Sequence, residues 1–225
     1  MAVQLESALI VAHHPTGAST GYMEDLRGRW PRLVQEALEV SPWAIELAAL
    51  GEDELPGLLA YLGEKPALPF RYLSVHAPVK GRALAEQDLV ATLAALPPAV
   101  DAIVVHPDLM EDPARYAAIG RRLVIENMDD RKPTGRTADE LAPLFAELPD
   151  AGLCFDVAHA GAIDPDMGVA EELLDRFRRR LRHIHISSLD EDGGHATLTS
   201  EDEQRFEPVL RRCRDVPWIL EAPPA

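Results

Sequence analysis

Eight short apolar runs, separated by longer stretches with helical spacing, constrain the fold of this chain most strongly. The runs are rich in Val, Ile and Leu, as are the strands of a parallel sheet that is buried on both faces. We expect strands at 8–12, 43–47, 70–76, 100–106, 122–127, 152–157, 181–187 and 216–221. Helical stripes lie between them, near 22–40, 52–62, 82–96, 137–148, 168–180 and 200–214, and Asp112-Pro113 is a helix-start signal for one more helix.

Eight strands alternating with seven helices predict a compact α/β fold, a (β/α)₈ barrel that residues 1–225 form as a single domain. The connections are long enough to keep neighbouring strands parallel. An open doubly wound sheet is the rival architecture, but it needs a glycine-rich phosphate loop, and no G-x-G-x-x-G follows an early strand. No helix is expected after the eighth strand. Either a neighbouring element or a second subunit of a homo-oligomer covers that side, or the side is less protected than usual.

The apolar runs end in carboxylate or imidazole side chains. In the clearest case, LCFDVAH, Asp156 closes an apolar run and His159 follows three residues later. A buried carboxylate without a partner is costly, so Asp156 indicates either a metal ion or a helix N-cap. Six other runs end in Glu46, His76, His106, Glu126, His185 and Glu221. The active site of such barrels lies at the carboxyl ends of the strands, so these side chains are expected to meet there.

Three carboxylates and one imidazole form the expected main ligand set, which is Glu126, Asp156, His185 and Glu221. Oxygen and nitrogen ligands without a thiolate suit Mn²⁺, Zn²⁺, Co²⁺, Mg²⁺ or Fe²⁺. His76 and His106 could hold a further ion, with Glu126 as a bridge. His159 and His195 could form a third, nitrogen-rich pocket. One divalent metal ion is expected, and two or three are the alternative.

Other residues near the strand ends have less specific roles. Asn127 and Ser187 could orient the ligands. Asn127 could also contact a substrate, as could His13 and His14 in the loop expected after the first strand. Arg131, Lys132 and Arg136 follow the fifth strand. They could bind a substrate phosphate or carboxylate, or they could simply be solvated.

Several of these residues also have purely structural interpretations. His76 and His106 could be hydrogen-bonded core histidines, and the same holds more strongly for His183, which shares a face with His185. Glu46 could be a buried partner of an arginine, and we favour that interpretation over a role as a metal ligand.

The composition is that of a soluble globular protein, with 47% hydrophobic and 27% charged residues. A formal net charge of −16 disfavours nucleic acid, because nucleic-acid affinity depends largely on Lys and Arg that neutralise phosphates. Two cysteines suggest no disulfide framework and fit the cytoplasm. The first apolar run is too short to span a membrane and lacks a basic flank, so neither a signal peptide nor a membrane helix is expected.

Seven strings at the expected strand ends and the loops after them resemble those of the xylose isomerase-like barrel superfamily: SVHAP, VVHPD, VIENMD, FDVAHA, HIHISS, GGHATL and WILEAP. That superfamily includes endonuclease IV, ketose 3-epimerases, hydroxypyruvate isomerases and inosose dehydratases. The resemblance covers nearly the whole chain, and the order Glu, Asp-x-x-His, His, Glu on strands five to eight is its most specific part.

The resemblance implies two different sites. In the epimerases, residues that match the main ligand set hold one metal ion. The glutamates that match Glu126 and Glu221 also move protons at the substrate carbon, and the histidine that matches His159 contacts substrate. Endonuclease IV instead holds three ions, with ligands that match His76, His106, Glu126, Asp156, His159, His185, His195 and Glu221.

The chain departs from both patterns. Endonuclease IV has an Asp two residues before its last histidine ligand, and Gly193 stands there, with Asp192 displaced by one. The epimerases have an Arg six residues after the histidine of strand seven, and Glu191 stands there instead. We therefore expect a divalent-metal-dependent sugar isomerase or epimerase, with a multinuclear phosphoesterase as the alternative. A binding barrel without turnover fits such a full ligand set least well.

Overall fold

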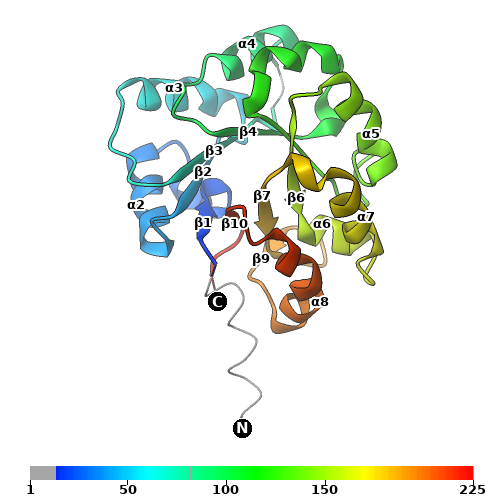
Figure 1. Ribbon diagram of the computed structural model, residues 1–225. Helices are drawn as coiled ribbons and strands as arrows, with labels where there is room; N and C mark the ends of the chain where they lie inside the picture. Colours follow the sequence, from blue (N-terminus) through cyan, green and yellow to red (C-terminus); the bar gives the residue numbers. More distant parts are fainter. Residues whose placement is uncertain (1–13, 82, 225) are drawn as a thin grey trace.

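The computed structural model describes residues 14–81 and 83–224, and Figure 1 shows its strands closing into a barrel. All barrel strands are parallel, and their order around the ring is β1-β10-β7-β6-β5-β4-β3-β2. The strands are β1 (Thr16–Ser19), β2 (Ala44–Ala48), β3 (Tyr72–His76), β4 (Ala102–Val105), β5 (Leu123–Glu126), β6 (Gly152–Asp156), β7 (Leu181–Ile186) and β10 (Trp218–Leu220). A hairpin of β8 (Ser188–Leu189) and β9 (His195–Ala196) follows β7. The predicted (β/α)₈ barrel is confirmed.

Helices connect the strands and surround the ring (Figure 1). The α-helices are α2 (Trp30–Val40), α3 (Leu55–Gly63), α4 (Glu86–Ala94), α5 (Ala138–Glu147), α6 (Val157–Ile163), α7 (Gly168–Phe177) and α8 (Ser200–Leu210). Shorter 3₁₀ elements are η1 (Thr20–Tyr22), η2 (Glu24–Leu26), η3 (Glu52–Glu54), η4 (Pro107–Leu109), η6 (Arg178–Arg180) and η7 (Arg211–Cys213), and η5 (Pro113–Arg122) is the longest.

The start of the chain differs most from the expectation. The strand predicted at 8–12 lies outside the described residues, and β1 occupies part of the segment that we expected to be a loop. Its sequence, TGAS, carries no apolar signal. Gly17 is required there because a Cβ would overlap the carbonyl oxygen of Ala44 on β2. The helix predicted from residue 22 begins only at Trp30, with Pro31 in its first turn.

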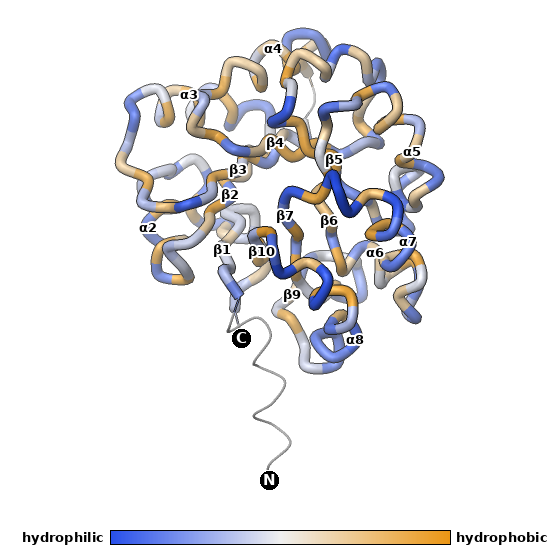
Figure 2. The backbone as a smooth tube through the Cα atoms, in the orientation of Figure 1, coloured by the Kyte–Doolittle hydropathy of each residue, from blue (hydrophilic) through white to orange (hydrophobic). Residues whose placement is uncertain are grey.

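Two apolar regions lie on opposite sides of the barrel wall. The larger one fills the space between strands and helices, and Figure 2 shows apolar residues concentrated along the strands. A small cluster of Ala102, Val104, Val124 and Cys154 forms the second region. The interior also holds polar contacts: the Tyr72 hydroxyl lies 2.7 Å from His183 Nδ1. Because β3 and β7 are not neighbours in the ring, this hydrogen bond must cross the interior.

The described part of the chain ends four residues after β10. Among the described residues, none after Leu220 are helical. A groove of about 840 Å³ lies beside β1 and α2, and Thr16, Val40 and Leu220 line part of it. The expectation that no helix follows the eighth strand therefore agrees with the described part of the chain. Within that part, no helix has the length and apolar character needed to cross a membrane.

Candidate metal centre

The polar side chains predicted at the strand ends lie together at one end of the barrel. Glu126 and Asp156 are the last residues of β5 and β6, His185 is next to last on β7, and Glu221 directly follows β10. A cavity of about 420 Å³ opens at this end, which is within the usual size range of small-molecule sites. Six of the predicted ligands line it: His76, His106, Glu126, His159, His195 and Glu221.

The main ligand set converges on one point. Glu126, Asp156, His185 and Glu221 each place one ligand atom within 4.8 Å of the others. His185 Nδ1 lies 3.1 Å from Glu126 Oε1 and 3.2 Å from Glu221 Oε1. Ligands bound about 2.1 Å from one ion lie roughly 3–4 Å apart, so the spacing suits a shared cation.

Glu126 also faces a second group through its other oxygen. Its Oε2 lies 3.1 Å from His106 Nε2 and 3.3 Å from His76 Nε2. One carboxylate therefore points one oxygen at the main set and the other at two imidazoles. This is the arrangement of a bridging carboxylate between two ion positions.

A third group forms around Asp156, His159 and His195, whose ligand atoms also lie within 4.8 Å of one another. Asp156 Oδ1 accepts a hydrogen bond of 2.7 Å from the backbone N–H of His159 and so caps α6. Its Oδ2 accepts no hydrogen bond from the described residues. The N-cap interpretation of Asp156 is therefore confirmed, and the other oxygen is left to face the site.

Three of the histidines are oriented through their Nδ1 atoms. His76 Nδ1 lies 2.9 Å from the carbonyl oxygen of Ala77, and His159 Nδ1 lies 2.9 Å from that of Asn127. A carbonyl oxygen can only accept, so these Nδ1 atoms carry the proton and Nε2 remains free as a ligand. His195 Nδ1 lies 2.8 Å from Ser187 Oγ, which agrees with the orienting role predicted for Ser187.

The two glutamates of the main set have opposite electrostatic environments. Burial alone would raise the pKa of Glu126, but the imidazoles of His185 and His106 outweigh it and hold that pKa well below its usual range. Burial raises the pKa of Glu221 well above its usual range despite His185, and the carboxylates of Glu126 and Asp156 add to the rise. A divalent cation among these carboxylates would relieve their mutual repulsion.

Unpaired buried oxygens show that the residues fit a metal ion. Asp156 Oδ2 and Glu221 Oε2 are buried, and neither accepts a hydrogen bond from the described part of the chain. No described lysine or arginine forms an ion pair with Glu126, Asp156 or Glu221, whose ionic contacts are all to histidines. Leaving such oxygens buried and unpaired is costly, and a divalent ion would satisfy them.

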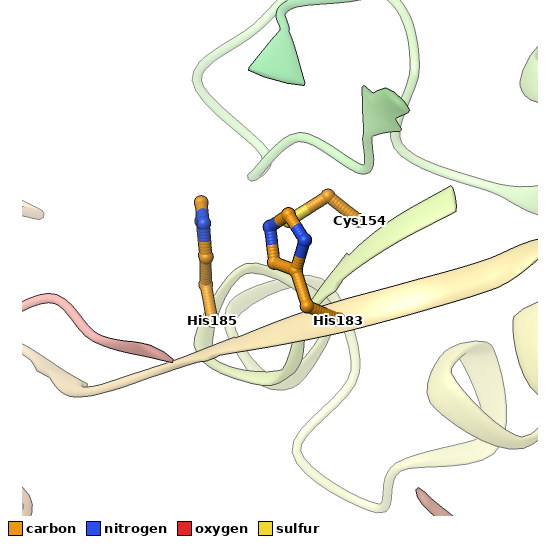
Figure 3. Close-up of side chains that lie close together, drawn as sticks. All are labelled: Cys154, His183 and His185. Carbon is orange, nitrogen blue, oxygen red and sulfur yellow. The ribbon is translucent and has the colours of Figure 1, made fainter. Parts of the chain in front are cut away.

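Glu46 lies below this centre, inside the barrel. We favoured an arginine as its partner, and that was wrong for the described residues: its ionic contacts are to His183 and His185. The imidazole of His185, followed by those of His76 and His183, holds the pKa of Glu46 at about 2 although burial alone would raise it. Figure 3 shows His183 and His185 projecting from the same side of β7, with Cys154 of β6 beside them.

Two of the predicted substrate contacts are used elsewhere. Asn127 donates a hydrogen bond from Nδ2 to the carbonyl oxygen of Asp156 and accepts one at Oδ1 from its N–H, both 2.8 Å long. It therefore holds the ends of β5 and β6 together and does not line the cavity. Arg136 forms an ion pair with Glu140, four residues along, and does not line the cavity either. Neither residue is placed for the substrate contact that we expected.

The remaining candidates differ in placement. Lys132 lines the cavity, where its Nζ lies 3.3 Å from Asp108 Oδ2. His13 lies outside the described residues. His14 precedes β1 and stacks on Trp218 with ring centroids 3.9 Å apart, at the amino end of the strands and away from the site.

Two features of the cavity rim were missed. Lys80 lines the cavity from the loop after β3, and its backbone N–H donates to the carbonyl oxygen of Leu50. Every loop after a strand in such a barrel is a candidate wall, and that rule would have found it. Gly193 has a φ of +74°, and a Cβ there would overlap the Arg131 guanidinium. The side chain that the endonuclease IV pattern requires at this position would therefore collide with Arg131.

A comparison with known protein families supports the resemblance that the strand-end residues indicate. The family model for the xylose isomerase-like TIM barrel matches residues 112–221, which include the main ligand set, His159 and His195. No curated protein matches the chain. The matched segment covers the strands from β5 onward, and the remaining strands complete the ring. Enzymes make up most of this family. The match supports the assignment of the chain to the xylose isomerase-like TIM barrel superfamily.

Proposed function

We propose that this protein is a divalent-metal-dependent isomerase or epimerase of a small sugar or another hydroxy-carbonyl compound. The observation that carries the proposal is that Glu126 and Glu221 both lie next to Nδ1 of His185, at 3.1 Å and 3.2 Å. Two carboxylates at one cation site can serve as the base and the acid of a proton transfer at carbon.

The chain's own residues would divide the reaction as follows. A bound divalent ion supplies Lewis acidity that makes the hydrogen next to the substrate carbonyl easier to remove. Glu126 takes that proton from carbon, and Glu221 returns a proton to the product. His159 lines the cavity with an unprotonated Nε2, so it can accept a hydrogen bond from a substrate hydroxyl.

The cavity favours a small and polar substrate. Its volume of about 420 Å³ accommodates a sugar-sized molecule. Lys80 and Lys132 line its rim in a protein of net charge −16. A substrate hydroxyl, carboxylate or phosphate would find a positive partner there.

A multinuclear metal-dependent phosphoesterase is the second candidate. The observation that favours it is the pair His76 and His106, whose Nε2 atoms lie 3.3 Å and 3.1 Å from the same oxygen of Glu126. Two bridged ions can generate a hydroxide and stabilise a departing oxygen. Gly193 lacks the side chain that would be a ligand of the third position, and a Cβ there would overlap Arg131. The acidic charge of the chain disfavours a DNA substrate.

Proton NMR of hydroxy-carbonyl compounds in D₂O tests the first candidate. Wild-type protein loaded with Mn²⁺ and then freed of excess ion should introduce deuterium at the carbon next to the carbonyl of at least one triose, tetrose or ketohexose. Glu126→Gln should slow this exchange by about 10²–10⁴-fold, because the base is lost. Glu86→Gln is the matched control. Glu86 is buried, accepts a hydrogen bond from the backbone N–H of Glu111 and does not line the cavity. The Glu86→Gln variant should therefore exchange deuterium at the rate of the wild type.

The same preparation distinguishes the second candidate. Hydrolysis of an aryl phosphodiester that needs His106, without any deuterium exchange, would replace the isomerase with the phosphoesterase. If Glu126→Gln kept full activity in both assays, both proposals would be refuted.

A further inference from the structure

The buried carboxylate below the metal centre has an unusual set of partners. Glu46 is on β2, is fully buried and accepts hydrogen bonds from two serines on neighbouring strands. Ser19 Oγ lies 3.3 Å from its Oε1, and Ser74 Oγ lies 2.9 Å from its Oε2. These serines fix the carboxylate in one orientation. Two imidazoles also face Glu46 Oε2: His185 Nε2 lies 3.2 Å from it and His183 Nε2 lies 3.6 Å from it.

His185 thus joins two carboxylate groups through its two ring nitrogens. Its Nδ1 faces Glu126 and Glu221 at the mouth, and its Nε2 faces Glu46 below. A carboxylate can only accept a hydrogen bond, so Glu46 requires a proton on Nε2. In a neutral imidazole the other nitrogen, Nδ1, then carries the lone pair that a metal ion needs.

The hydrogen bond between His185 and Glu46 depends on the barrel topology. In the ring, β7 pairs with β6 and β10, and β2 pairs with β1 and β3. The hydrogen bond between His185 and Glu46 therefore crosses the interior. His183 packs beside His185, with ring centroids 5.1 Å apart, and its Nδ1 is held by the Tyr72 hydroxyl. This packing leaves His185 little freedom to turn its ring over.

We propose that Glu46 is a positioning residue that fixes the tautomer and orientation of His185, so that Nδ1 faces the metal ion. This inference rests on the proposed function, because it assumes that His185 is a ligand. Hydrogen bonds of this kind, from a ligating histidine to a carboxylate, typically change metal affinity by about 10–100-fold.

The same region suggests a competing explanation. Cys154, His183 and His185 place ligand atoms within 4.8 Å of one another, so they could hold an ion of their own (Figure 3). Such an ion would have to share His185 with the main ligand set. The Tyr72–His183 and Glu46–His185 hydrogen bonds already satisfy one nitrogen of each ring without a metal.

Zinc affinity, measured by competition with a chromophoric chelator, tests the proposal. Glu46→Gln should bind zinc about 10–100-fold more weakly than the wild type, whereas the control Glu86→Gln should bind it equally. Cys154→Ala should keep the zinc count of the wild type. Equal affinity of Glu46→Gln and the wild type would overturn the role of Glu46. Loss of one zinc in Cys154→Ala would also overturn it, because the interior would then be a metal site.

A spectroscopic measurement separates positioning from a merely structural role. In ¹⁵N NMR spectra of the zinc-loaded wild type, His185 should carry its proton on Nε2 and show a metal-bound Nδ1. Metal on Nε2 would contradict the inference, and this result does not depend on whether Glu46→Gln folds. A wild type that binds no zinc would instead refute the proposed function itself.

Discussion

Single side chains at this centre perform two tasks at once. Asp156 caps α6 with one oxygen and directs the other toward the site. Glu126 divides its oxygens between His185 and the pair His76 and His106. Because each carboxylate oxygen can accept separately, one residue can link a structural contact to a ligand position, or one ion position to the next. Loss of such a residue should therefore disturb more than one contact.

His14 gives a prediction at the residue scale that is independent of the metal centre. Burial lowers the pKa of His14, against the opposing hydrogen bond of 2.7 Å from Nε2 to the carbonyl oxygen of Val216. The unfolded chain therefore binds the proton more readily than the folded one. Stability that depends on neutral His14 is complete above the unfolded pKa of about 6.5 and falls as the pH drops toward the lowered value.

Urea unfolding at pH 7.5 and pH 5 checks this prediction. The wild type should lose more unfolding free energy between these pH values than His14→Phe, which keeps an aromatic ring next to Trp218. Other histidines contribute equally to both proteins, so the difference isolates His14. Identical losses in the two proteins would rule out this effect.

The sequence predicted the residues at the strand ends better than it predicted their partners. Glu126, Asp156, His185 and Glu221 could be identified because each ends an apolar run, and the structure brings them together. The partners of Glu46 come from strands that are distant in sequence, so no local pattern reveals that His185 reaches it across the interior. Asn127 was misplaced for the same reason, since its hydrogen bonds to Asp156 depend on how β5 and β6 meet.

At the scale of elements, most strands could be predicted from the sequence, and those set by close packing could not. Seven of the eight strands overlap the predicted apolar runs, because buried parallel strands have a strong sequence signature. β1 has no such signature, since its small residues are selected by the close approach of β2. The hairpin of β8 and β9 was also missed. It carries His195 toward the cavity, and its pairing of Leu189 with His195 spans too few residues to predict.

Gly17 provides a prediction at the element scale. Gly17→Ala should destabilise the protein by about 1–3 kcal/mol, because the added methyl group overlaps the carbonyl oxygen of Ala44 and forces β1 away from β2. Gly63→Ala is the matched control. No atom lies within 4 Å of a Cβ at Gly63, so the change should be neutral or stabilise by less than about 1 kcal/mol. Equal unfolding free energies for the two variants in urea would contradict the tight packing of β1 on β2.

At the scale of the whole molecule, the closed ring places buried negative charge where a cation can balance it. Glu46, Glu126, Asp156 and Glu221 come from four different strands or strand ends and meet only because the barrel closes. Within the described part of the chain, histidines are their only ionic partners. The fold thus creates an electrostatic cost that a bound divalent ion would offset.

Metal content tests this account most directly. The protein is loaded with Mn²⁺ or Zn²⁺, freed of excess ion by gel filtration, and its metal is measured by atomic emission. We predict at least one ion retained per wild-type chain, and none at the main set in the folded double variant Asp156→Asn/Glu221→Gln. A wild type that retains no ion, or a double variant that retains as many as the wild type, would contradict the account.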